Sequence, residues 1–150
     1  MSTPESAAPK LFTIEEINDL IPSLSRLVAE QLALQGEIER GLAALARSSG
    51  GLPNSIEVDE SDDPELAQLK RELKDRILQY ETGWGKVQTL GAVIKDPQIG
   101  LLDFYGSLDG RLVCLCWRYG EKSLGFYHDL EAGYAGRRPI EPETRARLLN

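Results

Sequence analysis

The hydrophobic pattern of this 150-residue chain changes period once, at Gly91, and this change constrains the fold more than any other feature. Before Gly91 apolar residues recur at alternating spacings of three and four, which is the pattern of amphipathic helices. After Gly91 they recur with a period of two, which is typical of β-strands. Helices that precede strands without mixing predict an α+β fold, in which a long antiparallel helical hairpin is followed by a small antiparallel β-meander.

Two long helices are predicted, over about residues 13–47 and 64–90. The first begins at a capping box, in which Thr13 and Glu16 can each satisfy the other's backbone amide. Pro22 lacks an amide hydrogen, so we expect a short helix to about Leu20 and a longer one from Pro22, and a single kinked helix is the alternative. The narrow apolar seams of the two helices predict that they pair as a coiled-coil-like hairpin.

The segment between the two helices is acidic, with six acidic and no basic residues among residues 57–65. Such a block is typical of a solvated loop, and a surface that docks a metal or a peptide is the alternative. At the end of the block, Asp63 can cap the second helix, whose first residue would be Pro64.

Four short strands are predicted in the second half of the chain, over residues 92–95, 101–107, 111–118 and 123–129. Asp109 and Gly110, between the second and third strands, form a strong hairpin signal. The third strand is apolar on both faces, which indicates a central position in the sheet.

A chain of this length is expected to form one domain, here over residues 13–140. The expected parts are, in order, a disordered tail (1–12), the helical hairpin (13–90), the β-meander (92–130), a glycine- and arginine-rich tail (131–140) and a C-terminal tail or short helix (141–150).

The composition argues against several classes of function. With 17 basic and 24 acidic side chains the net charge is −7, so the chain lacks the basic surface that nucleic acids and anionic membranes attract. No run of 18 apolar residues is present to span a bilayer. Residues 1–10 lack the apolar centre of a signal peptide. We therefore expect a cytoplasmic protein whose two cysteines stay reduced.

Several short strings distributed along the chain carry a family resemblance. They are FTIEEIN (12–18), LIP (20–22), KDP (95–97), GLLDF (100–104), LCWR (115–118), GE (120–121), GFYHD (125–129) and GYAGRRP (133–139). Together they resemble a bacterial family catalogued as Domain of Unknown Function 2203, over roughly residues 11–140. The last string is the most specific, and at Tyr127 and Tyr134 the family pattern often has another aromatic residue. The resemblance implies a small protein of uncharacterised function with no established catalytic residues.

Two ionisable residues, His128 and Asp103, are predicted to lie among apolar neighbours in their strands. His128, the single histidine, shares a strand face with apolar residues, so it is either a buried histidine satisfied by a hydrogen bond or a group that transfers protons or binds a ligand. Asp103 lies in an apolar strand, where a carboxylate must be paired. Its partner would be Arg118 or another arginine, unless Asp103 itself acts as an acid, a base or a ligand.

Arg137 and Arg138 are adjacent in the glycine-rich tail of an otherwise acidic chain. They could hold a phosphate or carboxylate bidentately, or they could clamp the tail to Asp129 or Glu131. The predicted ligand is therefore an anionic small molecule. Arg137 and Arg138 would bind it beside His128, and Asp103 and Asp129 would orient these groups.

Cys114 and Cys116 point to the same face of their predicted strand, where both could reach a soft metal. A Cys-x-Cys pair with one histidine still lacks one or two ligands. Buried thiols are therefore the favoured interpretation, so the sequence predicts no metal site and leaves any cofactor unknown.

The chain contains no HExxH, no glycine-rich phosphate loop and no GxSxG motif, which favours a noncatalytic role. The predicted function is a noncatalytic interaction module that self-associates through its helical hairpin, and an unknown protein is a further predicted partner. The helix seams present more apolar edge than a two-helix hairpin can hide, which predicts a homodimer. The alternative is a protein or an enzyme that binds a small anion or a metal around the five residues of the predicted ligand site.

Overall fold

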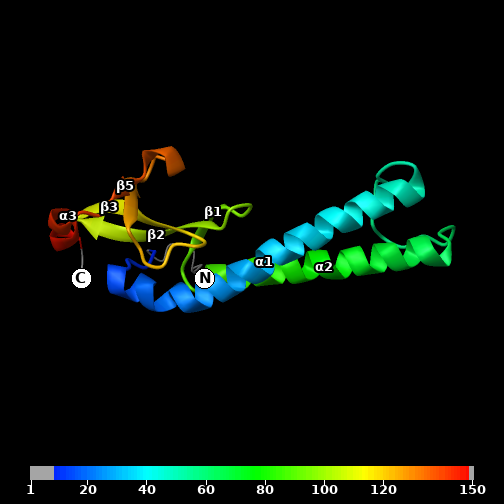
Figure 1. Ribbon diagram of the computed structural model, residues 1–150, viewed down its shortest axis with the longest axis horizontal. Helices are drawn as coiled ribbons and strands as arrows, with labels where there is room; N and C mark the ends of the chain where they lie inside the picture. The colour runs from blue at the N-terminus through cyan, green and yellow to red at the C-terminus, as the bar shows by residue number, and fades with distance from the viewer. Residues whose placement is uncertain (1–8, 149–150) are drawn as a thin grey trace, which may run out of the picture. The chain divides into compact units, whose positions relative to one another are not determined.

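The computed structural model describes residues 9–148 and has the predicted α+β architecture, with two long helices followed by an antiparallel sheet (Figure 1). Its internal contacts divide the chain into two compact units. The helical unit comprises residues 26–87, and the sheet unit comprises the described parts of residues 1–25 and 88–150.

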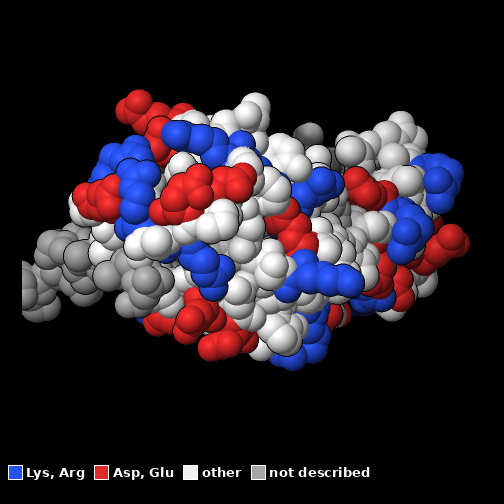
Figure 2. All heavy atoms as spheres, turned by 60° about the vertical axis from the view of Figure 1, so that its left-hand side comes forward, with Lys and Arg blue, Asp and Glu red and all other residues white. Residues whose placement is uncertain are grey.

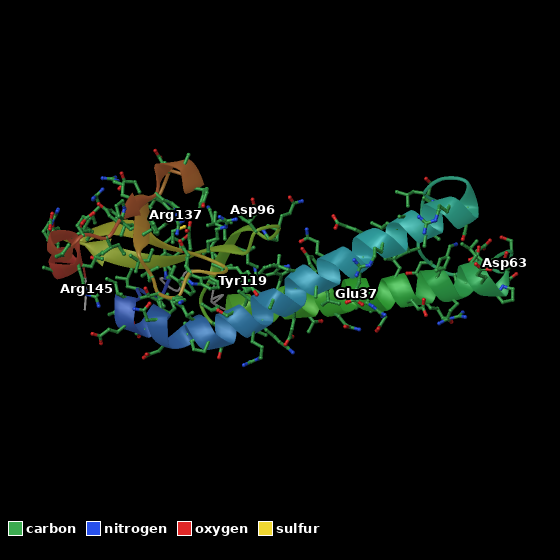
Figure 3. All side chains as sticks on the ribbon, viewed as in Figure 1. Glu37, Asp63, Asp96, Tyr119, Arg137 and Arg145 are labelled. Atoms are coloured by element: carbon green, nitrogen blue, oxygen red, sulfur yellow. The ribbon has the colours of Figure 1, made fainter. Side chains whose placement is uncertain are left out.

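The hairpin consists of α1 (Ile14–Ser49) and α2 (Pro64–Thr89), whose ribbons can be followed to the loop that joins them (Figure 1). α1 continues through Pro22 as a single helix, which corrects the expected break at this residue. Within the helical unit, Nε of Arg76 lies 3.0 Å from Oε1 of Glu37, which is labelled midway along the hairpin in Figure 3. Nε2 of Gln31 on α1 donates to the carbonyl oxygen of Tyr80 on α2 at 2.6 Å.

Both helices begin at the predicted caps. The Thr13 amide donates to Oε1 of Glu16 at 2.9 Å, and the Glu16 amide donates to Oγ1 of Thr13 at 3.1 Å. At the start of α2, Oδ1 of Asp63 accepts from the Leu66 amide at 2.8 Å. These bonds satisfy amide hydrogens that the first turn of a helix leaves without partners.

The acidic segment before α2 is mostly exposed, as predicted for a solvated loop. One buried cation attaches it to the helix: Nζ of Lys70 lies 2.9 Å from Oδ2 of Asp62 and 3.2 Å from the carbonyl oxygen of Glu57. Both partners of the Lys70–Asp62 pair are 7 % exposed. The Asp62 carboxylate therefore has a structural use, as the partner of a buried lysine on α2.

The sheet has five antiparallel strands in the order β1-β2-β3-β4-β5, so β3 is central as predicted. Their bounds are β1 Val93–Asp96, β2 Leu101–Leu108, β3 Arg111–Arg118, β4 Phe126–Asp129 and β5 Arg138–Pro139. The fifth strand is a correction, because the glycine- and arginine-rich tail was expected to be irregular. That tail contains a 3-10 turn, η2 (Tyr134–Gly136), and then pairs with β4. A short helix, α3 (Pro142–Arg147), follows.

One face of the sheet lies against the first turns of α1 (Figure 1). The rings of Phe12 and Phe104 meet edge to face at 5.0 Å, and Oδ1 of Asn18 accepts from the Leu124 amide at 2.7 Å. Phe12 is 3 % exposed, which corrects its assignment to a disordered tail. Residues 1–8 of that predicted tail lie outside the described residues, as do residues 149–150.

None of the helices among residues 9–148 combines the length and the apolar character that crossing a membrane requires.

Candidate functional site

The second face of the sheet carries ionisable side chains from β2, β3 and β4. Directly opposite residues in an antiparallel pair share a face, and the register pairs Asp103 with Cys116. Cys114 is paired with Tyr105 on one side and with His128 on the other. Because β3 lies between β2 and β4, Asp103 and His128 approach each other across the strand that carries both thiols.

Asp103 and His128 are paired and almost fully buried. Each side chain is 2 % exposed, and Nε2 of His128 lies 3.0 and 3.1 Å from the two carboxylate oxygens of Asp103. The carboxylate in the apolar strand is therefore paired, as its burial requires. Its partner is the histidine, which corrects the expectation of Arg118 or another arginine.

The hydrogen bonds of the His128 ring determine where its hydrogens lie. Nδ1 is 2.7 Å from the backbone carbonyl oxygen of Asp129, which can only accept, so Nδ1 carries a hydrogen. Nε2 then either carries a second hydrogen and donates to an ionised Asp103, or accepts from a protonated Asp103. In both cases one proton is held between the two side chains, and the pair as a whole is neutral.

Cys114 and Cys116 are free and buried beside this pair. Burial raises the pKa of the Cys114 thiol to about 11 and that of Cys116 to about 12, and the charge of Asp103 adds to both shifts. The charge of Lys95 opposes the rise in the pKa of Cys114. At neutral pH both thiols therefore keep their protons.

One group of histidine, cysteine and acidic side chains within residues 9–148 brings its ligand atoms together. A carboxylate oxygen of Asp103, Sγ of Cys114 and a ring nitrogen of His128 all lie within 4.8 Å of one another. Oxygen, sulfur and nitrogen donors in one cluster suit Zn²⁺ or a similar transition metal. Asp103 joins Cys114 and His128 in this group, and Cys116 is outside it.

A pocket of about 270 Å³ opens beside this group. Asp103 and Cys114 are among its lining residues, and His128 is not. Lys95 and Tyr105 supply the other polar groups of the lining. The remaining lining residues are Pro9, Val93, Leu112 and Leu130. The pocket thus has mainly apolar walls and gives access to two of the three ligand-type side chains.

Asp129 and Arg138, two of the other predicted site residues, form a separate cluster with Arg111. Asp129 follows His128 in the strand, so its side chain points to the opposite face of the sheet. Its carboxylate lies 2.7 Å from Arg111 and 2.7 Å from Arg138. The clamp between the tail and Asp129, which was one of the two interpretations of Arg138, is therefore present.

Arg137 is also held by protein groups. Its Nη2 donates to Oε1 of Glu121 at 2.8 Å and to the carbonyl oxygen of Cys116 at 3.2 Å, and its guanidinium stacks on the ring of Phe126 at 4.0 Å. Figure 3 labels Arg137 beside the sheet. On the face drawn in Figure 2, basic and acidic side chains lie next to one another rather than in patches of one sign. An anion at Arg137 and Arg138 would have to compete with these ion pairs.

The structure thus brings together Asp103 and His128 of the five predicted residues, and adds Cys114, Lys95 and Tyr105 to their surroundings. The spacing of the two cysteines indicated which thiols share a face. No local signal distinguishes Lys95 from other exposed lysines, because its position depends on the pairing of β1 with β2.

Comparison with known proteins gives one match. A sequence model of a family described as "Uncharacterized conserved protein (DUF2203)" matches residues 10–140. No curated protein and no solved structure matches the chain. Because the match covers most of the sequence and includes both units, the chain belongs to the DUF2203 family of uncharacterized conserved proteins.

Proposed function

We propose that this chain is a metal-binding protein that holds a divalent transition metal, with Zn²⁺ as the favoured ion, on Asp103, Cys114 and His128. The observation that carries the proposal is the convergence of one oxygen, one sulfur and one nitrogen ligand atom within 4.8 Å in a buried cluster. Each of the three is a common zinc ligand, and three protein ligands with an open position are typical of a catalytic rather than a structural zinc site.

The surroundings of His128 support this proposal. Metal-ligating histidines usually donate their second ring N–H to a carbonyl or a carboxylate, which fixes the ring and the tautomer. His128 makes such a contact, because its Nδ1 lies 2.7 Å from the carbonyl oxygen of Asp129. This bond leaves Nε2 directed at Asp103 and available as a ligand. The three side chains also come from adjacent strands, which hold them more rigidly than loops would.

The charges of the site also balance with a divalent ion. Without metal, the Asp103–His128 pair shares one proton and Cys114 holds another, so the buried cluster is neutral. With metal, the cluster contains two positive charges on the ion, one negative charge on the thiolate and one on the carboxylate. Two protons leave, and the cluster is neutral again, which avoids burying a net charge. A reducing compartment such as the cytoplasm would keep Cys114 available as a ligand.

Cobalt titration tests the proposal. Adding Co²⁺ to metal-free protein should give one equivalent of a complex with a thiolate-to-cobalt charge-transfer band in the near ultraviolet. Cys114→Ser should remove that band, and His128→Gln should weaken binding by more than about tenfold. Elemental analysis of the purified protein checks for zinc in parallel.

Cys116→Ser is the matched control, because Cys116 is a buried thiol on the same strand face but outside the ligand group. It should keep the cobalt complex. Metal binding that depends on Cys116 and not on Cys114, or no binding at all, would contradict the proposed site.

A second candidate function is self-association through the hairpin, as the helix seams predicted. Leu27, Leu34 and Ile38 are only half-buried within the described helical unit, and Leu78 is 53 % exposed. Nε1 of Trp84 is buried with no hydrogen-bond partner among the described residues. A second copy of the hairpin would cover these four apolar side chains. Coiled-coil packing between the two copies stays a prediction.

Sedimentation tests the predicted dimer. We expect the full chain to sediment as a dimer at micromolar concentration, and Leu34→Asp to convert it to a folded monomer, since a buried unpaired carboxylate would be costly at the interface. Leu52→Asp, at a residue 62 % exposed and outside the seams, should leave the dimer intact. Wild-type protein that remains monomeric at high micromolar concentration would exclude this function, and circular dichroism identifies any variant that fails to fold.

A further inference from the structure

We propose that the pocket beside the proposed metal site binds a small carboxylic acid in its ionised form. Its carboxylate group would contact both the metal and the ammonium group of Lys95. This inference rests on the proposed metal site. It identifies the class of molecule that the site would receive, and it moves the predicted anion from Arg137 and Arg138 to a different cation.

The arrangement of the lining leaves one side of the metal ligands accessible. Asp103 and Cys114 line the pocket of about 270 Å³, whereas His128 is outside the lining. Three protein ligands leave a zinc ion with a fourth position for water or a substrate. Because two of the three ligands border the pocket, this is the direction from which a fourth ligand would arrive.

Lys95 is placed towards the pocket by an irregularity in the sheet. β1 pairs Ile94 with Leu102 and Asp96 with Leu101, so Lys95 is the extra residue of a β-bulge. Bulges redirect a side chain and occur often beside functional sites. Lys95 lines the pocket, and it lies near enough to Cys114 for its charge to act on the thiol.

Lys95 lines the pocket without a counter-ion from residues 9–148 of the protein. Among the described residues it forms no ion pair, whereas Arg111 and Arg138 are paired with Asp129, and Arg137 is paired with Glu121. A cation at a pocket that makes no internal ion pair can take an external anion without breaking an existing contact. Tyr105 adds a hydroxyl group to the same lining.

The walls restrict the size and polarity of the anion. Val93, Leu112 and Leu130 are apolar, and the volume of about 270 Å³ suits a small molecule. A carboxylate with a short hydrocarbon chain matches this lining better than a phosphate, which needs several polar partners around its oxygens. The metal and Lys95 would hold the carboxylate, and the apolar walls would contact the chain.

The test uses the full chain loaded with Co²⁺ and titrated with propionate, with inorganic phosphate as a second arm. At Co²⁺ concentrations that saturate each protein, propionate should shift the visible absorption of the bound cobalt. Lys95→Gln should weaken propionate binding by roughly tenfold to a hundredfold, the range expected for one charge-assisted hydrogen bond. Lys122→Gln, at an exposed lysine in the turn before β4, is the matched control and should bind propionate as the wild type does.

The possible failures can be told apart. If propionate leaves the visible absorption of the bound cobalt unchanged, or shifts it equally in the wild type and in Lys95→Gln, the carboxylate pocket is wrong. The proposed metal site would still stand. Tighter binding of phosphate than of propionate would overturn the assignment of the ligand class. A chain that binds no cobalt would overturn both the metal site and this inference.

Discussion

Asp103→Leu is expected to lower the free energy of unfolding of the metal-free protein by about 3–5 kcal/mol, the range found when one partner of a buried ion pair is removed. The reason is that His128, 2 % exposed, would keep a hydrogen-bonding ring nitrogen with no partner. His128→Leu should cost a similar amount, because it leaves the Asp103 carboxylate buried without its partner. Urea denaturation in the presence of a chelator measures both values.

The double variant Asp103→Leu/His128→Leu separates pairing from packing. Replacing both members of a buried pair by apolar groups is often close to neutral, so the double variant should recover most of the loss. Recovery should be incomplete, since the Asp129 carbonyl oxygen would still lack its Nδ1–H donor. If the losses of the single variants simply added, the two side chains would not be coupled, and the shared proton inferred from the geometry would be wrong.

Much of the fold could be predicted because its signals are local. The capping box of Thr13 and Glu16, the Asp63 cap and the two-residue turn at Asp109 and Gly110 each depend on neighbouring residues, and each is present. The change of hydrophobic period similarly reports which face of each element is buried. These features give the class and order of elements, and they leave open which strands meet and in what register.

The Asp103–His128 pair shows what local signals omit. The two residues are 25 positions apart, and they meet across β3 because β2 and β4 flank it in one particular register. A shift of one residue in either strand would turn one of the two side chains to the other face. The sequence therefore indicated that Asp103 needs a partner but could not identify the histidine.

The fifth strand was missed for a related reason. β5 has only two residues, and one of them is Pro139, which favours neither a long strand nor a central one. It is held by tertiary contacts, namely the pairing of Arg138 with Tyr127 in the sheet and the ion pair of Arg138 with Asp129. Composition alone therefore predicted an irregular tail.

Gly83→Ala is expected to destabilise the protein by about 2 kcal/mol, although alanine is normally the better helix former. A Cβ atom at Gly83 would lie 1.8 Å from Oε1 and 2.5 Å from Cδ of Gln31. Gln31 is 2 % exposed and donates to the Tyr80 carbonyl oxygen, so its amide cannot move without breaking that bond inside the hairpin. Overpacking of this kind typically costs about 1–3 kcal/mol, and a lost buried hydrogen bond adds about 1 kcal/mol. The gain in helix propensity offsets about 0.5–1 kcal/mol.

Gly85→Ala is the matched control, because Gly85 lies in the same helix on the other side of Trp84 and nothing lies within 4 Å of its added Cβ. Without a clash, only the propensity gain remains, and the variant should be more stable by about 0.5–1 kcal/mol. In thermal or urea unfolding, the midpoint should therefore be lower than that of the wild type for Gly83→Ala and higher for Gly85→Ala. Combining Gly83→Ala with Gln31→Ala removes the side chain that the new methyl group meets, so the cost of the two substitutions together should be less than the sum of their separate costs. Equal effects of the two glycine substitutions would mean that Gln31 does not approach α2 as closely as its bond to Tyr80 requires.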